Sequence, residues 1–354
     1  MEPAMEYLKI KHGGTKKIES RKILVTGGLG FIGSHTVELF HKWHPKTPIV
    51  ILDACTYAVL SSTRKIIESL DNVEIVEGNL TDFKLVQDLM SKHAFTHVLH
   101  FAAESHVGNS FDENSLTFTM TNVLGTHTLL EAWRLSKHRE KLELFVHVST
   151  DEVHGTVKEG RRGEEAIKKA LLLPTNPYAA SKAAAEMQIH AYKTSYGLPA
   201  VITRGNNVYG PRQHSEKLIP RTLLHTLKKE VTEIHGDGEQ KRSFIYIADV
   251  ARAFACMLDS PKEALKDGVV LIGSHSEYTV IEVVRDAATA LKEDVNCEFV
   301  KDPRPFNDKR YLSGMSACIR RVLVDHSISR ELTTWEVGMA QTARWYQKHV
   351  DEFR

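Results

Sequence analysis

Two neighbouring carboxylates stand in the segment VSTDEVHG, residues 148–155, at the end of a hydrophobic run. Asp151 and Glu152 follow Ser149 and Thr150, so two acids and two hydroxyls come where a predicted buried strand ends. Adjacent carboxylates repel each other when both are ionised. Such a pair either lies in water or serves chemistry in which one acid holds a proton that the other has released.

A tyrosine and a lysine lie four residues apart in the segment YAASK, at Tyr178 and Lys182. The predicted helix begins just after Pro177, and this spacing places both side chains on one helix face. The lysine ammonium can lower the pKa of the phenol, which then takes a proton from an alcohol while hydride leaves its carbon. The pair therefore predicts redox chemistry at a hydroxyl group.

Three glycines, Gly27, Gly30 and Gly33, occur in TGGLGFIG, where a predicted strand turns into a predicted helix. Glycines at such a turn let backbone amides and the positive helix end meet a pyrophosphate without interference from Cβ atoms. Asp53 follows 20 residues after Gly33, at the end of the next predicted strand, where a carboxylate binds the ribose hydroxyls of adenosine. An acid there favours NAD, because it would repel the extra phosphate of NADP and the flanking ILDACTY contains no arginine.

The elements that must position these residues alternate between short hydrophobic runs and amphipathic stretches. Strands rich in Val, Ile and Leu and separated by helices predict an α/β protein with a doubly wound parallel sheet, the Rossmann fold. After residue 210 the elements become shorter and mixed, which predicts a smaller α/β substrate-binding lobe over the carboxyl edge of the sheet. We expect a mobile N-terminal arm over residues 1–20, an NAD-binding domain over 21–210 and mainly the smaller lobe over 211–354, with segments free to cross between lobes. Helices are predicted near residues 31–42, 61–69, 83–92, 115–136, 178–196, 220–229, 249–258 and 280–291.

Composition narrows the class of protein. Lys and Arg total 46 against 45 Asp and Glu, so a net charge of +1 gives no overall attraction to nucleic acid or to a membrane surface. The 4 cysteines are scattered and the 19 histidines show no metal-ligand spacing, so neither a disulfide framework nor a metal site is expected. The sequence contains no signal peptide and no apolar run of about 18 residues. We therefore expect a cytoplasmic protein that acts on a small molecule.

Taken together, the motifs resemble those of the extended short-chain dehydrogenase/reductase superfamily, and within it the NDP-glucose 4,6-dehydratases. The glycine turn, Thr150 and the Tyr-Lys pair are shared across the superfamily, whereas acids directly after the threonine, here STDEV, are the dehydratase pattern. Further similar segments are HFAAESHV at 100–107, TNPYAASKA at 175–183, TRGNNVYGP at 203–211, EKLIPR at 216–221 and RPFNDKRY at 304–311. The resemblance covers nearly the whole chain after residue 21. The segments TRGNNVYGP and RPFNDKRY look closest to eukaryotic members, including the dehydratase part of plant rhamnose synthases.

The resemblance implies a mechanism. Tyr178, tuned by Lys182, would take the proton of the sugar 4-hydroxyl while C4 gives hydride to NAD, with Thr150 bonded to the same oxygen. The new 4-keto group acidifies the C5 proton, which Glu152 would remove as base while Asp151 as acid protonates the departing 6-hydroxyl. Water leaves across C5 and C6, and hydride returns to C6, which gives an NDP-4-keto-6-deoxy-glucose.

The resemblance also implies which residues contact each ligand. Besides the tyrosine and lysine, NAD would contact Gly27, Gly30, Phe31, Ile32, Gly33, Asp53, Asn79, Leu80 and Ala102. The nucleotide sugar would contact His106, Asn207, Glu216, Lys217 and Arg242, with Arg304, Asn307 and Tyr311 closing over the diphosphate. Arginine suits that task because its forked donors match phosphate oxygens.

Three positions depart from the family pattern: His154 replaces a tyrosine, and Asn79 and Gly108 each replace an aspartate. His154 can donate a hydrogen bond or titrate near neutrality, so it bears on the neighbouring acids. We expect that a tyrosine at this position would preserve activity. The departures affect the expected rate and substrate preference more than the expected fold.

Two alternatives stay open. A 4-epimerase or decarboxylase of the same superfamily would share most motifs, but it leaves Asp151 and Glu152 unexplained. A catalytically silent NAD-binding scaffold would fit the three departures, but the intact Thr150, Tyr178 and Lys182 argue against it. The sequence does not distinguish UDP-glucose from dTDP-glucose. Analogy with the family and two long predicted helices lead us to expect a homodimer.

Overall fold

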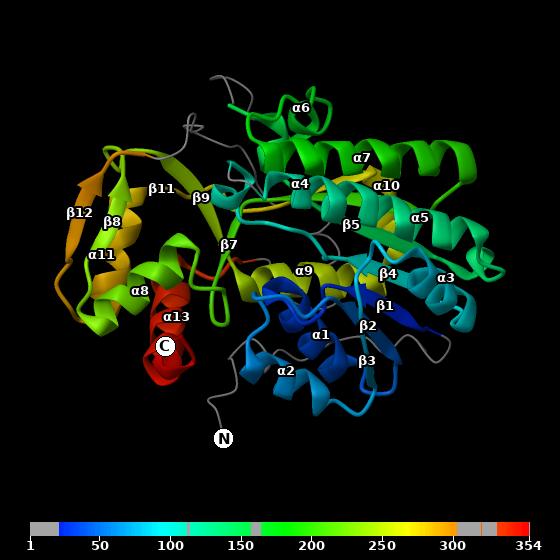
Figure 1. Ribbon diagram of the computed structural model, residues 1–354, viewed down its shortest axis with the longest axis horizontal. Helices are drawn as coiled ribbons and strands as arrows, with labels where there is room; N and C mark the ends of the chain where they lie inside the picture. The colour runs from blue at the N-terminus through cyan, green and yellow to red at the C-terminus, as the bar shows by residue number, and fades with distance from the viewer. Residues whose placement is uncertain (1–20, 112–113, 157–163, 303–319, 321–330, 354) are drawn as a thin grey trace.

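Seven parallel strands form the main sheet, in the order β10-β6-β5-β4-β1-β2-β3 (Figure 1). They belong to a computed structural model that describes residues 21–111, 114–156, 164–302, 320 and 331–353. The strands are β1 (Ile23–Thr26), β2 (Ile49–Asp53), β3 (Val73–Glu77), β4 (His97–His100), β5 (Leu144–Thr150), β6 (Ala200–Gly205) and β10 (Val269–Ile272). The strand order reverses direction between β1 and β4, and an open α/β sheet binds ligands at the carboxyl ends of such neighbours. The predicted doubly wound sheet is confirmed.

Hydrophobic residues face both sides of this sheet because successive side chains of a strand point to opposite faces. Ile23 and Val25 of β1 belong to one core, whereas Leu24 belongs to the other. One core is closed by α1, α2 and α9, and the other by α3, α5 and α7. The bounds are α1 (Phe31–Trp43), α2 (Ser61–Glu68), α3 (Phe83–Lys92), α5 (Gly125–Leu135), α7 (Pro177–Tyr196) and α9 (Ile247–Asp259).

The helix predicted over 115–136 is not regular along its length. α4 (Ser115–Phe118) continues into a π-helical turn, Thr119–Leu124, before α5 begins. Within that turn the amide of Asn122 bonds both backbone groups of Glu104 and the hydroxyl of Ser181 on α7. A π-helical turn inside a helix re-aims a side chain, and here it joins two segments that border the carboxyl edge of the sheet.

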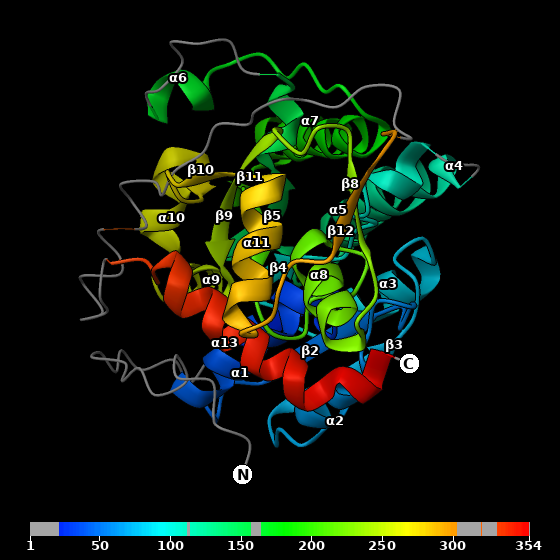
Figure 2. The same ribbon diagram turned by 90° about the vertical axis from the view of Figure 1, so that its left-hand side faces the viewer.

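The smaller lobe lies at one end of the main sheet, on the left in Figure 1 and facing the viewer in Figure 2. Its strands form a three-stranded sheet, β11-β9-β7, and a parallel pair, β12-β8. The elements of this lobe are β7 (Asn207–Tyr209), α8 (Leu218–Lys228), β8 (Thr232–His235), β9 (Lys241–Tyr246), β11 (Glu277–Thr279), α11 (Val280–Ala290), β12 (Cys297–Val300) and α13 (Trp335–His349). The expected smaller α/β lobe is therefore present.

The chain passes between the two parts more than once. After β9, helix α9 returns to the main sheet and packs against α1. α10 (Pro261–Asp267) then leads into β10, which pairs with β6 as the outermost strand. The other short helices in the part of the chain that the structure describes are Gly108–Phe111, Arg139–Lys141, Asp151–His154, α6 (Glu164–Lys168) and Val350–Phe353. Within the described ranges, no helix has both the length and the hydropathy that a membrane span requires.

Candidate active site

A cavity of about 600 Å³ lies at the carboxyl edge of the main sheet and is also lined by residues of the smaller lobe. Seventeen of the residues implied by the sequence line it: Gly27, Gly30, Phe31, Ile32, Gly33, Asp53, Ala102, His106, Thr150, Asp151, Glu152, Tyr178, Lys182, Asn207, Glu216, Lys217 and Arg242. Asn79 and Leu80 are not among the lining residues: Asn79 is exposed and accepts two hydrogen bonds from Thr81, and Leu80 is buried. Arg304, Asn307 and Tyr311 lie outside the described residues.

The glycine turn leaves no room for a Cβ at Gly27 or Gly33. Gly27 has φ +69°, and a Cβ on it would stand 2.7 Å from the backbone nitrogen of Ala102. A Cβ on Gly33 would stand 2.3 Å from the carbonyl oxygen of Gly27. Helix α1 begins directly after Gly30, which supplies no side-chain cap to the first amides of the helix. This cradle matches what a pyrophosphate needs at a helix N-terminus.

Asp53 ends β2 beside the glycine turn. Its two carboxylate oxygens accept hydrogen bonds from the backbone amides of Leu29 and Cys55, each 2.9 Å long. Burial raises the pKa of Asp53, and the two amide bonds lower it. An arginine does come near: Arg64 of α2 reaches the sulfur of Cys55, although ILDACTY itself contains none. Arg64 also forms ion pairs with Glu68 at 2.8 Å and with Glu77 at 3.3 Å, so its positive charge is already paired with two carboxylates.

The two neighbouring acids have different surroundings. Asp151 is 5% exposed, and its carboxylate accepts a hydrogen bond from the Asn206 amide at 3.0 Å. Burial, and then the charge of Glu152, raise the pKa of Asp151 well above its ordinary value. Glu152 is only half-buried and accepts a hydrogen bond from the Asn176 amide at 3.0 Å. The site thus favours a protonated Asp151 beside a hydrogen-bonded Glu152 carboxylate.

Tyr178 and Lys182 stand one turn apart on α7, which begins with Asn176 as N-cap and Pro177 in the first turn. Burial and then the Glu152 charge raise the pKa of Tyr178, and a hydrogen bond with Thr150 lowers it less. The expected lowering of the phenol pKa is therefore not seen in this structure, because burial outweighs it. Burial lowers the pKa of Lys182 to about 8, against the raising effect of Glu186.

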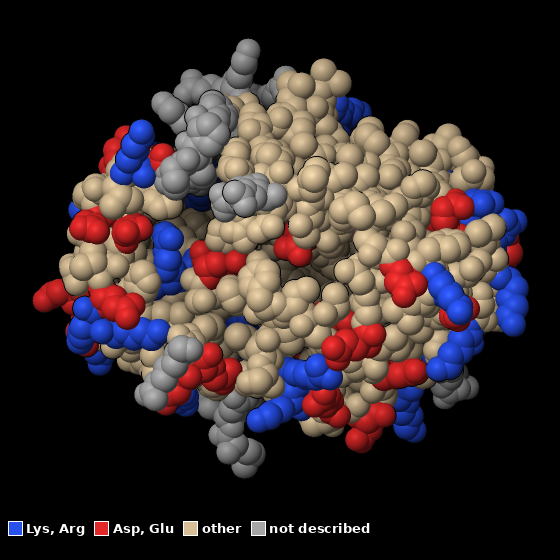
Figure 3. Space-filling model, in the orientation of Figure 1, with Lys and Arg blue, Asp and Glu red and all other residues tan. Residues whose placement is uncertain are grey.

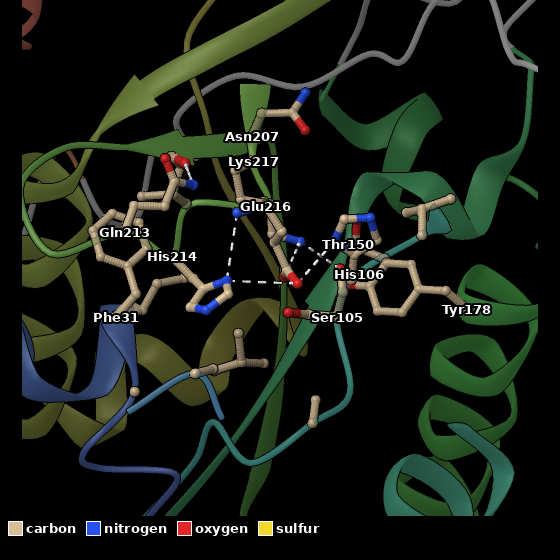
Figure 4. A pocket seen from close by; sticks show the side chains of 18 of the residues that line it. Phe31, Ser105, His106, Thr150, Tyr178, Asn207, Gln213, His214, Glu216 and Lys217 are labelled. Atoms are coloured by element: carbon tan, nitrogen blue, oxygen red, sulfur yellow. Dashed lines mark hydrogen bonds and ion pairs between the residues drawn. The ribbon is translucent and has the colours of Figure 1, made fainter. Parts of the chain in front are cut away.

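A second group of charges faces the cavity from the opposite wall, around Glu216 (Figure 4). Its carboxylate lies 2.9 Å from Nδ1 of His106, 3.1 Å from the Tyr57 hydroxyl and 3.4 Å from the Lys217 ammonium. Lys217 also donates a 2.8 Å hydrogen bond to the carbonyl oxygen of Ser105. Burial would raise the pKa of Glu216, but the contact with His106 and the nearby charges lower it to about 2. The group therefore holds an ionised Glu216 beside the Lys217 ammonium.

Two other implied residues lie on the β9 side of the cavity. The amide of Asn207 donates to the carbonyl oxygen of Ser243 at 3.3 Å, and Arg242 lines the wall. The positive charge of Arg242 lowers the pKa of Asp151, although less than burial raises it. A cation from the smaller lobe therefore comes within electrostatic reach of the acid pair.

Comparison with known proteins agrees with this geometry. Residues 24–322 match the family model described as GDP-mannose 4,6 dehydratase. The chain belongs to this family. It is 40% identical over 94% of its length to a trifunctional UDP-glucose 4,6-dehydratase/UDP-4-keto-6-deoxy-D-glucose 3,5-epimerase/UDP-4-keto-L-rhamnose-reductase of Arabidopsis thaliana, of which it covers 48%. It is also 34% identical to the human dTDP-D-glucose 4,6-dehydratase, with 95% of the chain and 92% of the human protein covered. The chain thus spans about half the length of the curated plant relatives and nearly all of the human one.

Solved structures place this dehydratase-family chain among the extended short-chain dehydrogenase/reductases. The dTDP-glucose 4,6-dehydratase of Bacillus anthracis in complex with NAD superposes with a TM-score of 0.79 at 32% identity, covering 94% of this chain and 98% of that one. A UDP-glucuronic acid 4-epimerase of Bacillus cereus with UDP-glucuronic acid and NAD gives the same TM-score, 0.79, at 26% identity, with 92% and 99% covered. The fold alone therefore does not separate the dehydratase from the epimerase branch.

The departures from the dehydratase-family pattern have structural consequences. A Cβ on Gly108 would stand 2.7 Å from Nε2 of His106, so the missing side chain leaves space for that imidazole in the cavity wall. His154 is buried, 8% exposed, at the end of the Asp151–His154 turn. The side-chain oxygen of Asn79 accepts hydrogen bonds from Thr81 in its own turn, and Asn79 does not line the cavity.

Sequence reasoning missed two asparagines that hold the acids. Asn206, and not its neighbour Asn207, bonds Asp151, and its oxygen accepts from the backbone amide of Ser274 at 2.8 Å. Asn176 bonds Glu152 while it caps α7 through the backbone amide of Ala179. A usable signal existed for both: each asparagine stands at the end of a strand or the start of a helix that meets the carboxyl edge of the sheet.

Proposed function

We propose that this chain is an NAD-dependent NDP-glucose 4,6-dehydratase that converts UDP-glucose or dTDP-glucose to the 4-keto-6-deoxy sugar nucleotide. One observation carries the proposal. Asp151 and Glu152 share one cavity with Tyr178 and Lys182, and their surroundings favour a proton on Asp151 and a bonded carboxylate on Glu152. Removal of water requires such an acid and base together.

The described residues fit NAD. Gly27 and Gly33 of the cradle have no room for a Cβ, and the Asp53 carboxylate beside them is held by two backbone amides. When bound, NAD would accept hydride from C4 of the sugar and return it to C6. We propose that residues 21–210 hold the cofactor and that the segment after 211 mainly holds the nucleotide sugar. Asn79 and Leu80 remain predictions for the adenosine end.

Proton removal from the sugar 4-hydroxyl is assigned to Tyr178. Its phenol hydrogen bonds with Thr150, which makes the pair a joint partner for one sugar oxygen. The phenol needs its pKa lowered before it can act as base, because burial and the charge of Glu152 raise it. Lys182 supplies a cation one helical turn away, because its pKa, although lowered to about 8, leaves the side chain mainly protonated at neutral pH.

Elimination is assigned to the acid pair. Glu152 takes the proton from C5, which the 4-keto group has acidified, and the electron pair of that C–H bond forms the C5–C6 double bond. Asp151 gives its proton to the 6-hydroxyl, which leaves as water. The return of hydride to C6 leaves C5 to be protonated, and Glu152 gives C5 that proton. The proton that Tyr178 took from the 4-hydroxyl then passes through solvent to Asp151, so that all three groups are reset for the next substrate.

Binding of the nucleotide sugar is assigned to the wall around Glu216 and to the β9 side. Lys217 and Arg242 supply positive charge for the diphosphate, while His106 and Asn207 offer hydrogen bonds. Arg304, Asn307 and Tyr311 remain predicted contacts. Both uracil and thymine present the same hydrogen-bonding edge, so the proposal covers both nucleotides.

Incubation of the purified protein with UDP-glucose, dTDP-glucose, GDP-mannose, UDP-galactose and UDP-glucuronic acid tests the function. Each reaction is followed by liquid chromatography with mass spectrometry, so that sugar nucleotides of equal mass are also separated. We expect a product lighter by one water from UDP-glucose or dTDP-glucose. Conversion of UDP-glucose to an isomer of unchanged mass would favour the 4-epimerase, and a loss of carbon dioxide from UDP-glucuronic acid would favour a decarboxylase. Binding of NAD with no change in any sugar nucleotide would favour the silent scaffold.

We further propose that the chain forms a homodimer through α4, α5 and α7. Leu116, Met120 and Leu124 are 76%, 50% and 41% exposed at four-residue intervals, and Met187 of α7 is 54% exposed. The surface over α4 and α7 carries few charged side chains in Figure 3. Met120→Lys should convert a dimer to a monomer in sedimentation equilibrium, whereas a monomeric unmodified protein would contradict the proposal. A cytoplasmic location remains a prediction.

A further inference from the structure

A buried ion pair lies behind the turn Asp151–His154, here called the acid turn. Glu186 of α7 is fully buried and Arg204 of β6 is 4% exposed. The guanidinium Nε lies 3.1 and 3.2 Å from the two carboxylate oxygens, and Nη2 lies 2.6 Å from one of them. Buried charges of this kind are stable only when the geometry is good and the remaining donors also find partners.

His154, the last residue of the acid turn, contacts the remaining terminal nitrogen of the Arg204 guanidinium, Nη1. Its Nε2 lies 3.2 Å from Nη1 of Arg204. A guanidinium has only donors, so Nε2 must accept, and the ring is then neutral with its proton on Nδ1. Any hydrogen bond that His154 donates therefore comes from Nδ1 and not from the nitrogen that faces Arg204.

The same ion pair also reaches the helix that carries the tyrosine and lysine. Tyr178, Lys182 and Glu186 follow each other at four-residue intervals, so they share one face of α7. The charge of Glu186 opposes the effect of burial on the pKa of Lys182. One guanidinium thus joins the helix face, strand β6 and the acid turn.

We propose that His154 is a positioning residue: through Arg204 and Glu186 it fixes the acid turn against α7, and so sets where Glu152 and Asp151 stand relative to the sugar. This inference rests on the proposed dehydratase function. It also explains why a histidine can replace the family's tyrosine, since either side chain offers an acceptor to the guanidinium.

The proposal separates the two halves of the reaction. The Thr150 hydroxyl accepts a hydrogen bond from the Glu152 amide at 3.2 Å, but the backbone of Thr150 is held by its pairing with Gly205 of β6 and Tyr178 is held on α7, so the backbone positions of the two residues that deprotonate the 4-hydroxyl are not set by the acid turn. Removal of the C5 proton does depend on it. Loss of the His154 contact should therefore slow elimination and leave oxidation at C4 and substrate binding intact.

The test compares His154→Met, which has no comparable acceptor, with His154→Gln and His154→Tyr, which keep one. We expect His154→Met to lower kcat by about 10- to 100-fold with KM within about twofold, because small misplacements of catalytic groups have effects of this size. Deuterium uptake at C5 from heavy water should fall in parallel, and His154→Gln and His154→Tyr should restore both. His190→Met makes the same change at an exposed position of α7 and serves as control.

The outcomes are distinguishable. Wild-type protein that removes no water would overturn the proposed function and this inference with it. An active wild type with an unchanged His154→Met variant, or a variant in which KM rises while kcat holds, would overturn this inference alone. If thermal unfolding shows that His154→Met does not fold, Arg204→Lys keeps a charge for Glu186 without the forked contact, and the same loss of kcat and of C5 exchange is expected.

Discussion

Lys182 offers a direct test of the electrostatics of the site. Its side chain is buried on α7, 4% exposed, and burial lowers its pKa from 10.5 to about 8 while the charge of Glu186 raises it. An ammonium held in such a place destabilises the folded state at neutral pH. Lys182→Met removes the charge and keeps an unbranched side chain of similar length, so we expect a protein that is inactive but more stable.

The size of the effect follows from the two pKa values. Below pH 8 the lysine is protonated in both the folded and the unfolded chain, and the full cost of burying the charge is present. Above pH 10.5 it is neutral in both, and the cost is absent. The unfolding free energy therefore falls as the pH is lowered from 10.5 to 8, because the folded chain must then bury a charged lysine. The difference between the two values corresponds to about 3 kcal/mol of unfolding free energy.

Urea denaturation of the wild type and of Lys182→Met, without added cofactor, measures this difference at several pH values. The unfolding free energy of the variant minus that of the wild type should be larger by about 3 kcal/mol at pH ~7 than at a pH above 10.5. Lys169→Met, at a side chain that is 79% exposed, controls for the change in net charge. A difference between wild type and Lys182→Met that does not change with pH would refute the reasoning.

Three further predictions concern groups around the cavity. Gly33→Ala should weaken NAD binding by at least about tenfold in calorimetric titration, because its Cβ would stand 2.3 Å from a backbone oxygen; unchanged affinity would contradict the cradle. Asn206→Leu removes a bond that lowers the pKa of Asp151, so the alkaline limb of the kcat profile should move to higher pH, and a move to lower pH would count against Asp151 as the acid. Asn176→Ala should reduce the unfolding free energy by about 1 kcal/mol through loss of the α7 cap and should also lower kcat; a loss of stability with full activity would show that only the cap matters.

Much of the main sheet could be predicted because its signals are local. The helix predicted over 83–92 has the bounds of α3, and those predicted near 31–42 and 178–196 differ by one residue at one end. Short buried strands between amphipathic helices leave few topologies open. The π-helical turn at Thr119–Leu124 could not be predicted in this way, because it depends on contacts of Asn122 with distant segments.

The smaller lobe was predicted less completely. Strand β10 joins the main sheet next to β6 although 64 residues separate Gly205 from Val269, and no local pattern records such a return. β11 and β12 are only 3 and 4 residues long, too short for a hydrophobic periodicity to mark them. Their positions are set by pairing with β9 and β8.

At the candidate site, residue types were easier to predict than environments. The acid pair, the tyrosine and the lysine reach one cavity, as their motifs indicated. Burial and neighbouring charges decide how each titrates, and these are tertiary effects: the pKa of Tyr178 is raised where a lowered value was expected. Arg64 likewise approaches the end of β2 from α2, which a search along ILDACTY alone does not detect.

The most direct test of the whole account uses UDP-glucose or dTDP-glucose that carries deuterium at C4. The account predicts a product that has lost one water and carries that deuterium in its C6 methyl group. Deuterium that remains on C4, in a product that has kept its water and has the inverted configuration at C4, would show an epimerase. A dehydrated product with the C4 deuterium lost to solvent would contradict the return of the same hydride to C6, and with it the central claim.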